Sequence, residues 1–125
     1  MLVVNRFEVT DGAEAQFDED ARQALTALSR CRGFLRGRCG ASVDQPEQRV
    51  LVTEWETVGA YRRALSAFDV KMYATPLLAR AIPETSAFEV TLSAEGEDIA
   101  EYSRDRADGH GLRERESAVN DPERS

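Results

Sequence analysis

From residue 2 to residue 9 the chain alternates with a two-residue period. One side of the alternation carries Val3, Asn5, Phe7 and Val9. Successive side chains of a strand point to opposite faces, so this spacing predicts a half-buried strand. An apolar stripe at helical spacing follows, made of Phe17, Ala21, Ala24, Leu25 and Leu28. It predicts an amphipathic helix with Thr10 or Asp11 as N-cap and Gly33 as a left-handed cap beyond its last turn.

The segments after residue 33 continue this succession of strands and helices. Residues 34–42 and 49–56 predict two strands joined by a hairpin turn, and Gly37 and Gly40 in the first of them either weaken the strand pattern or mark a bulge. Thr57 then caps a helix, whose apolar positions are Val58, Tyr61, Leu65 and Phe68. Pro76 interrupts residues 69–82, which predicts a short broken helix there, and residues 85–92 alternate as a fourth strand.

The order of predicted elements is β-α-β-β-α-β. That order, with both helices amphipathic, is typical of a ferredoxin-like α+β domain, in which helices cover one face of an antiparallel sheet. The other face is left without a covering layer. We therefore expect two copies of the chain to pair through it as a homodimer.

Composition divides the chain of 125 residues into a folded part and a charged part. Residues 1–94 are nearly neutral, with 13 acidic and 11 basic residues, whereas residues 95–125 carry ten acidic residues and five arginines. We expect one domain over 1–94 and, over 95–125, a tail that is disordered or orders only on a partner, with one short helix around residues 99–102. The formal net charge of -7 argues against a nucleic-acid partner.

The chain contains no apolar run long enough to cross a bilayer, and its start resembles no leader peptide. We expect a cytoplasmic protein with no membrane partner and with its two cysteines reduced. The sequence lacks a phosphate-binding glycine loop, a nucleophile elbow and any cluster of cysteine and histidine. Its single histidine, His110, lies in the predicted tail, so we expect neither a metal site nor a cofactor.

Asn5 and Trp55 are the candidate catalytic residues. Asn5 places an amide on the strand face where an apolar side chain is expected, and a buried amide needs partners. Either it bonds nearby backbone, or it points into a ligand pocket. A strand tryptophan such as Trp55 usually belongs to a core or an interface, and substrate stacking is the alternative.

The candidate substrate-binding residues are mostly aromatic, and they are Tyr61, Phe68, Met72, Tyr73 and Arg38. The aromatic side chains and Met72 would line a flat cavity, although their helical spacing suits plain core packing equally well. Arg38 has a solvated charge as its simplest interpretation. An arginine facing inward would instead stabilise an enolate or phenolate.

Four segments in order resemble the antibiotic biosynthesis monooxygenase (ABM) domain family, and together they span residues 2–93. They are VVNRFEVTDGAEAQF, CRGFLRGRCG, RVLVTEWETVGAYRRAL and SAFEVTL. The resemblance implies a protomer that joins a second copy in a dimeric α+β barrel. One branch of the family oxidises anthrone-type aromatic polyketides to quinones with O2 and no cofactor, which implies a small aromatic substrate and suggests Asn5, Trp55 and Tyr61 as pocket residues.

Two other functions follow from the same resemblance. The haem-degrading branch shares the strand-one asparagine, but its tryptophan and axial histidine fall near Ala64 and near Ala74 or Thr75 here, so haem degradation is disfavoured. A non-catalytic dimeric protein that binds a small ligand or assists another enzyme is the main alternative to the cofactor-independent monooxygenase. The sequence identifies no particular substrate.

Overall fold

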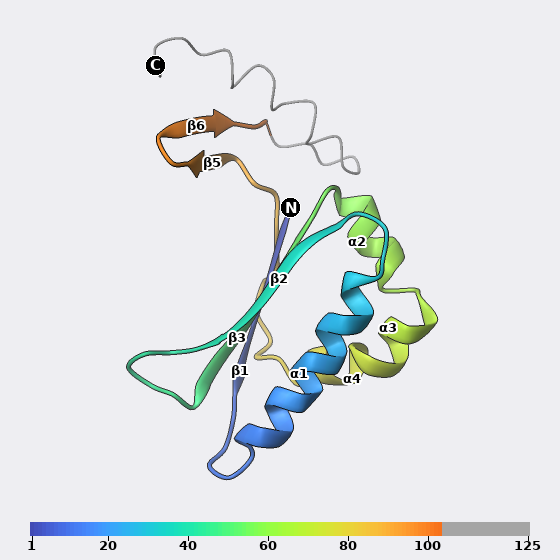
Figure 1. Cartoon of the computed structure of the whole chain (residues 1–125), viewed down its shortest axis with the longest axis vertical. Helices are drawn as coiled ribbons and strands as arrows, with labels where there is room; N and C mark the ends of the chain where they lie inside the picture. Colours follow the sequence, from blue (N-terminus) through green and yellow to red (C-terminus); the bar gives the residue numbers. More distant parts are fainter. Residues whose placement is uncertain (104–125) are drawn as a thin grey trace.

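The computed structural model describes residues 1–103 (Figure 1). A four-stranded antiparallel sheet contains β1 (Leu2–Glu8), β2 (Phe34–Ala41), β3 (Gln48–Trp55) and β4 (Ala87–Phe88), in the order β2-β3-β1-β4. The helices are α1 (Glu14–Ser29), α2 (Val58–Ala64), α3 (Phe68–Tyr73) and α4 (Thr75–Leu78). This is the expected ferredoxin-like α+β arrangement.

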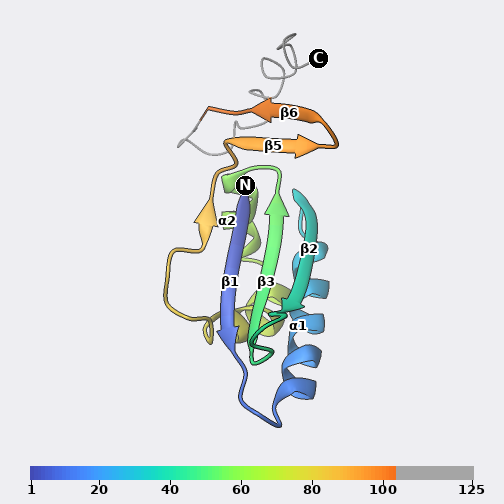
Figure 2. The ribbon, with the colours of Figure 1, turned by 90° about the vertical axis from the view of Figure 1, so that its left-hand side faces the viewer.

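The helices cover one face of the sheet, and Figure 2 looks onto the other face. The covered face carries the core, where Phe7 of β1 meets Phe17 of α1 edge to face at 5.1 Å. Leu2, Val4 and Val52 lie on the opposite face and are half-buried. Within residues 1–103 no helix lies over this face of the sheet (Figure 2).

Several local predictions are confirmed. Gly33 has the expected left-handed backbone, with φ +89°, although α1 already ends at Ser29 with Arg30 as its C-cap, so Gly33 turns the chain beyond the cap. The Thr57 hydroxyl caps α2 by accepting a hydrogen bond from the Ala60 N–H at 2.9 Å. The broken helix of residues 69–82 is α3 followed by α4, with Pro76 in the first turn of α4, where a missing N–H costs least.

Other local predictions are wrong. The N-cap of α1 is Ala13, and neither Thr10 nor Asp11 gives a side-chain cap. The bulge in β2 lies between Phe34 and Arg36, so Leu35 is its extra residue and the glycines are regular ladder positions. The position of a bulge is decided by pairing with the neighbouring strand. The glycines alone therefore predicted the wrong position for it.

The largest difference concerns residues 85–101. The fourth strand is only the two residues of β4, and a separate hairpin of β5 (Leu92–Glu95) and β6 (Asp98–Glu101) follows it. The expected short helix at 99–102 is therefore wrong, and the expected boundary between residues 94 and 95 falls inside β5. Gly96, with φ +63°, lets the chain turn there. The rest of the expected tail, with His110, lies outside the described residues.

In the part of the chain from 1 to 103, no helix has the length and apolar character needed to cross a membrane.

Gly33 gives a test of this architecture. A Cβ at this position would lie 2.4 Å from the Cβ of Ala60, and the backbone has φ +89°. We expect Gly33→Ala to lower the free energy of unfolding by about 2–4 kcal/mol, from left-handed strain and overpacking together. Gly12→Ala is the matched control, because Gly12 has φ +90° but open space around it. Urea unfolding would measure both, and equal losses would contradict the close packing of α2 on this turn.

Candidate functional site

Asn5 lies on the helix-covered face of β1, in register with Leu51 of β3. Its side chain is half-buried, and its amide makes no hydrogen bond with any group of residues 1–103. The amide does not bond nearby backbone, and it does not line the cavity described below. Asn5 thus holds a donor and an acceptor that the described fold does not use.

Trp55 ends β3 on the same face and is fully buried. Its indole N–H donates a hydrogen bond to the Thr53 hydroxyl at 2.9 Å. The rings of Phe34 and Tyr61 flank the indole, at centroid distances of 5.2 Å and 5.6 Å. The indole is therefore a core side chain whose single donor is already bound.

Tyr61 is the outer member of this aromatic group. Its ring is half-buried against Trp55, and burial raises the pKa of its phenol. No group of residues 1–103 forms a hydrogen bond with the hydroxyl. Tyr61 therefore offers a neutral phenolic donor at neutral pH.

Asn5 and Trp55 are separated along the sheet. Asn5 pairs with Leu51, four residues before Trp55, which places the two Cα positions about 13 Å apart along the strands. Val3 and its register partner Thr53 lie between them, and both are buried. Packed core side chains therefore separate the amide from the aromatic group.

The other candidate substrate-binding residues lie elsewhere. Phe68, Met72 and Tyr73 are on α3 and have exposed fractions of 73%, 51% and 49%. Arg38 pairs with Val52 on the face of the sheet away from the helices, and it is exposed. The structure does not bring Arg38 together with Asn5 and Tyr61.

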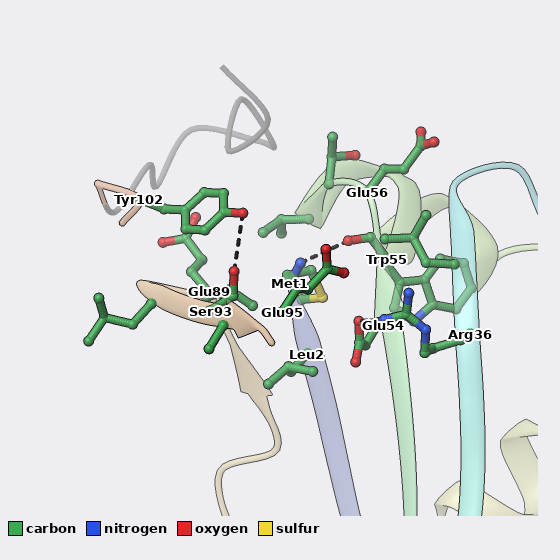
Figure 3. A pocket seen from close by; sticks show the side chains of 16 residues that line it. Met1, Leu2, Arg36, Glu54, Trp55, Glu56, Glu89, Ser93, Glu95 and Tyr102 are labelled. Carbon is green, nitrogen blue, oxygen red and sulfur yellow. Dashed lines mark hydrogen bonds and ion pairs between the residues drawn. The ribbon is translucent and has the colours of Figure 1, made fainter. Parts of the chain in front are cut away.

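A cavity of about 370 Å³ lies at the end of the sheet, between the strands and the β5–β6 hairpin (Figure 3). Its lining comes from the starts of β1 and β2, the end of β3 with the following turn, and residues 89–95 with Tyr102. Trp55 is the one residue of the sequence-predicted set that lines it. Sequence reasoning missed the cavity because residues 95–101 were assigned to the tail, although Gly96 between two short alternating runs was a hairpin signal.

Carboxylates dominate the charge around this cavity. Glu54, Glu56, Glu89 and Glu95 line it together with Arg36 and the N-terminal ammonium of Met1. Arg36 forms an ion pair with Glu54. The ammonium donates a hydrogen bond to the Trp55 carbonyl at 2.8 Å, and burial lowers its pKa although Glu54 and Glu89 act in the opposite direction.

Within residues 1–103, no group of three or more histidine, cysteine, aspartate or glutamate side chains is placed to hold a metal ion. Both cysteines, Cys31 and Cys39, are free thiols.

The fold is that of a ferredoxin-like α+β protein, with Asn5 and Tyr61 as polar groups on the helix-covered side of its sheet. The family model described as "Antibiotic biosynthesis monooxygenase" matches residues 1–74. The chain belongs to this family. The β5–β6 hairpin lies beyond the matched residues.

Solved structures agree with this assignment. SnoaB, a cofactor-independent oxygenase from Streptomyces nogalater, is 31% identical with a TM-score of 0.57, and the match covers 65% of this chain and 82% of SnoaB. A conserved protein from Methanosarcina mazei is 16% identical with a TM-score of 0.57, over 69% of this chain and 84% of that one, and shows likeness of fold alone. A comparison with curated proteins gives no match.

The raised pKa of Tyr61 predicts a measurable titration. The chain has three tyrosines, so subtracting the tyrosinate absorbance of Tyr61→Phe from that of the wild type isolates Tyr61. We expect the difference to have a midpoint above the ordinary value of about 10, because burial disfavours the phenolate.

The same shift affects stability. The unfolded chain releases this proton at its ordinary pKa while the folded chain retains it, so Tyr61 lowers the free energy of unfolding as pH rises above about 10. Tyr61→Phe should show a weaker loss over that range. A midpoint at or below the ordinary value would contradict the described burial.

Proposed function

We propose that this protein is a cofactor-independent, O2-dependent monooxygenase that oxidises a planar phenolic or anthrone-type substrate to a quinone. The observation that carries the proposal is the 31% identity to a cofactor-independent oxygenase over 82% of that enzyme's chain. Family membership over residues 1–74 supports it. The protein is expected to work in the cytoplasm as a homodimer.

The reaction places small demands on the protein. A deprotonated anthrone gives an electron to O2, which leaves a substrate radical and superoxide. These two radicals combine, and protonation gives a hydroperoxide on the carbon that was the CH2 group. Loss of water then leaves a carbonyl, so the CH2 group becomes C=O while one oxygen atom of O2 enters the product and the other becomes water. The protein has to orient the substrate, exclude bulk water and stabilise the developing oxyanion.

Asn5 is the proposed donor to that oxyanion. Its amide is half-buried and makes no hydrogen bond within residues 1–103, so it has a free N–H to offer without breaking the fold. Tyr61 is a second proposed donor, since its phenol stays protonated at neutral pH. Donors of this kind are worth most where the surroundings are apolar and the partner carries charge.

Trp55 has an indirect part in this proposal. Its N–H is bound to Thr53, and its ring contacts Tyr61, so it fixes the phenol rather than donating to the substrate. Phe68, Met72 and Tyr73 offer apolar surface on α3 for a flat ring system. Arg38 faces the proposed partner copy, on the sheet face away from Asn5.

The packed core favours a second candidate function. Val3 and Thr53 lie between Asn5 and Trp55, whereas a ligand-sized cavity lies beyond them, at the end of the sheet where β3 finishes with Trp55. A non-catalytic protein of the same fold that binds a small ligand, or assists another enzyme, would need no more than that cavity. Turnover distinguishes the two functions.

Oxygen uptake is the test of the enzymatic proposal. Purified, chelator-treated protein should consume O2 with a trihydroxyanthracenone faster than the substrate oxidises spontaneously. Asn5→Ala should lower kcat about 100-fold, as loss of one oxyanion donor does in other enzymes. Gln23→Ala is the control, because it removes an exposed amide from the outer side of α1.

An unchanged rate in Asn5→Ala would remove Asn5 from the mechanism. If the wild-type protein accelerates neither anthrone nor quinol oxidation, the ligand-binding function becomes the better proposal.

The homodimer has a separate test. Light scattering should give twice the 13.9 kDa chain mass for the wild type. Val52→Lys should give one chain mass, because it places a charge on the uncovered sheet face. Val43→Lys is the matched control in the β2–β3 turn, where the side chain is 95% exposed. A wild-type mass of one chain at micromolar concentration would contradict pairing.

A further inference from the structure

Thr53 is the one buried polar residue in the part of the chain from 1 to 103, with an exposed fraction of 3%. It lies in β3 on the helix-covered face, in register with Val3 of β1 and Gly37 of β2. A buried hydroxyl lowers stability unless it has a hydrogen-bond partner. Valine has the same shape without the hydroxyl, so threonine at this position directs attention to what the hydroxyl binds.

The partner of this hydroxyl is the indole of Trp55, two residues further along the same strand. The indole N–H donates to the Thr53 hydroxyl at 2.9 Å. Trp55 is fully buried, so bulk water does not reach this N–H, which is the only donor of the indole. Without the hydroxyl, the N–H would be left unsatisfied in the core unless the indole turned. The hydrogen bond therefore selects one orientation of the indole.

Gly37 on the neighbouring strand fixes the Thr53 side chain itself. A Cβ at Gly37 would lie 3.3 Å from the Thr53 methyl carbon and 3.2 Å from Cζ of Phe34. The missing side chain thus leaves room for the methyl group and for the Phe34 ring, which packs edge to face on the Trp55 indole. Because a β-branched side chain has few χ1 rotamers, a methyl group held beside Gly37 also holds the hydroxyl toward the indole.

The Trp55 indole in turn supports the ring of Tyr61. The two ring centroids are 5.6 Å apart and the ring planes are inclined by 55°. Tyr61 belongs to α2 and Trp55 to β3, so this contact joins the helix to the sheet. Protein interiors are close-packed, so a rotation of the indole would displace the ring beside it. The orientation set by Thr53 therefore reaches the phenol of Tyr61.

We propose that Thr53 is a positioning residue for the oxygenase reaction, in which its hydroxyl fixes the Trp55 indole and the indole fixes the Tyr61 phenol. This inference rests on the proposed function, where Tyr61 donates a hydrogen bond to the developing oxyanion. Thr53 is too deeply buried to contact the substrate and acts only through Trp55. A donor displaced by about 1 Å can lower a rate about 100-fold, which is why support at this distance from the chemistry affects turnover.

NMR of the full chain tests the structural link, because a single tryptophan gives a single indole N–H resonance. In Thr53→Val the N–H loses its acceptor, so we expect its proton resonance to move upfield and the Overhauser contacts between the indole and the Tyr61 ring to weaken. Thr53→Ser keeps the hydroxyl and should preserve both signals. Thr26→Val is the matched control, because it removes an exposed hydroxyl that donates to a carbonyl of its own helix at 2.8 Å. Unchanged indole–Tyr61 contacts in Thr53→Val would overturn the proposal, whatever the turnover.

Oxygen uptake with the trihydroxyanthracenone tests the catalytic link in the same variants. Thr53→Val should lower kcat about tenfold and leave KM within about twofold, because the oxyanion that Tyr61 stabilises is absent from the bound ground state. Thr53→Ser should restore most of the lost kcat, and Thr26→Val should match the wild type.

Urea unfolding of the same variants separates positioning from stability. Losses of kcat that follow the loss of stability equally in Thr53→Val and Thr53→Ser would overturn the proposal. Failure of the proposed function has a different signature, in which the wild type itself shows no turnover while the indole–Tyr61 contacts still respond to Thr53→Val.

Discussion

The register between β1 and β3 is the constraint on which the rest of the structure depends. Val3 pairs with Thr53 and Asn5 with Leu51, and both pairs face the helices. Because side chains alternate along a strand, a slip of one residue would turn Val3 and Phe7 away from the helices and bury Arg6. β1 also pairs with β4, and the Ile82 N–H donates to the Arg6 carbonyl at 2.7 Å. The same register that builds the core therefore places the unused Asn5 amide on the helix-covered face.

Much of the fold could be predicted from local sequence. Periodicity located β1, α1 and β3, and the Thr57 cap and Gly33 turn depend on contacts within a few residues. The length of β4 could not be predicted in this way, because residues 89–92 have strand composition and only pairing with β1 decides where the strand ends. The β5–β6 hairpin was missed for a related reason, since its charged composition suggested a tail while the Gly96 turn allowed pairing.

The candidate site was predictable only in part. Asn5 was noticeable because an amide interrupts an apolar alternation, and the structure places it on the expected face. Trp55 could not be assigned from sequence, because its role depends on Thr53, Phe34 and Tyr61 closing around the indole. The cavity beside the hairpin is assembled from segments far apart along the chain. No local pattern carries such information, whereas tertiary packing does.

Trp55 is the only tryptophan of the chain, and it is buried between two aromatic rings. Its indole emission therefore arises from a dry, rigid environment, with Tyr61 close enough to transfer excitation to it. Opening of the junction between β3 and α2 would wet the indole and separate the two rings at once. The emission wavelength of Trp55 therefore reports the hydration of the core. The efficiency of energy transfer from Tyr61 to Trp55 reports the docking of α2.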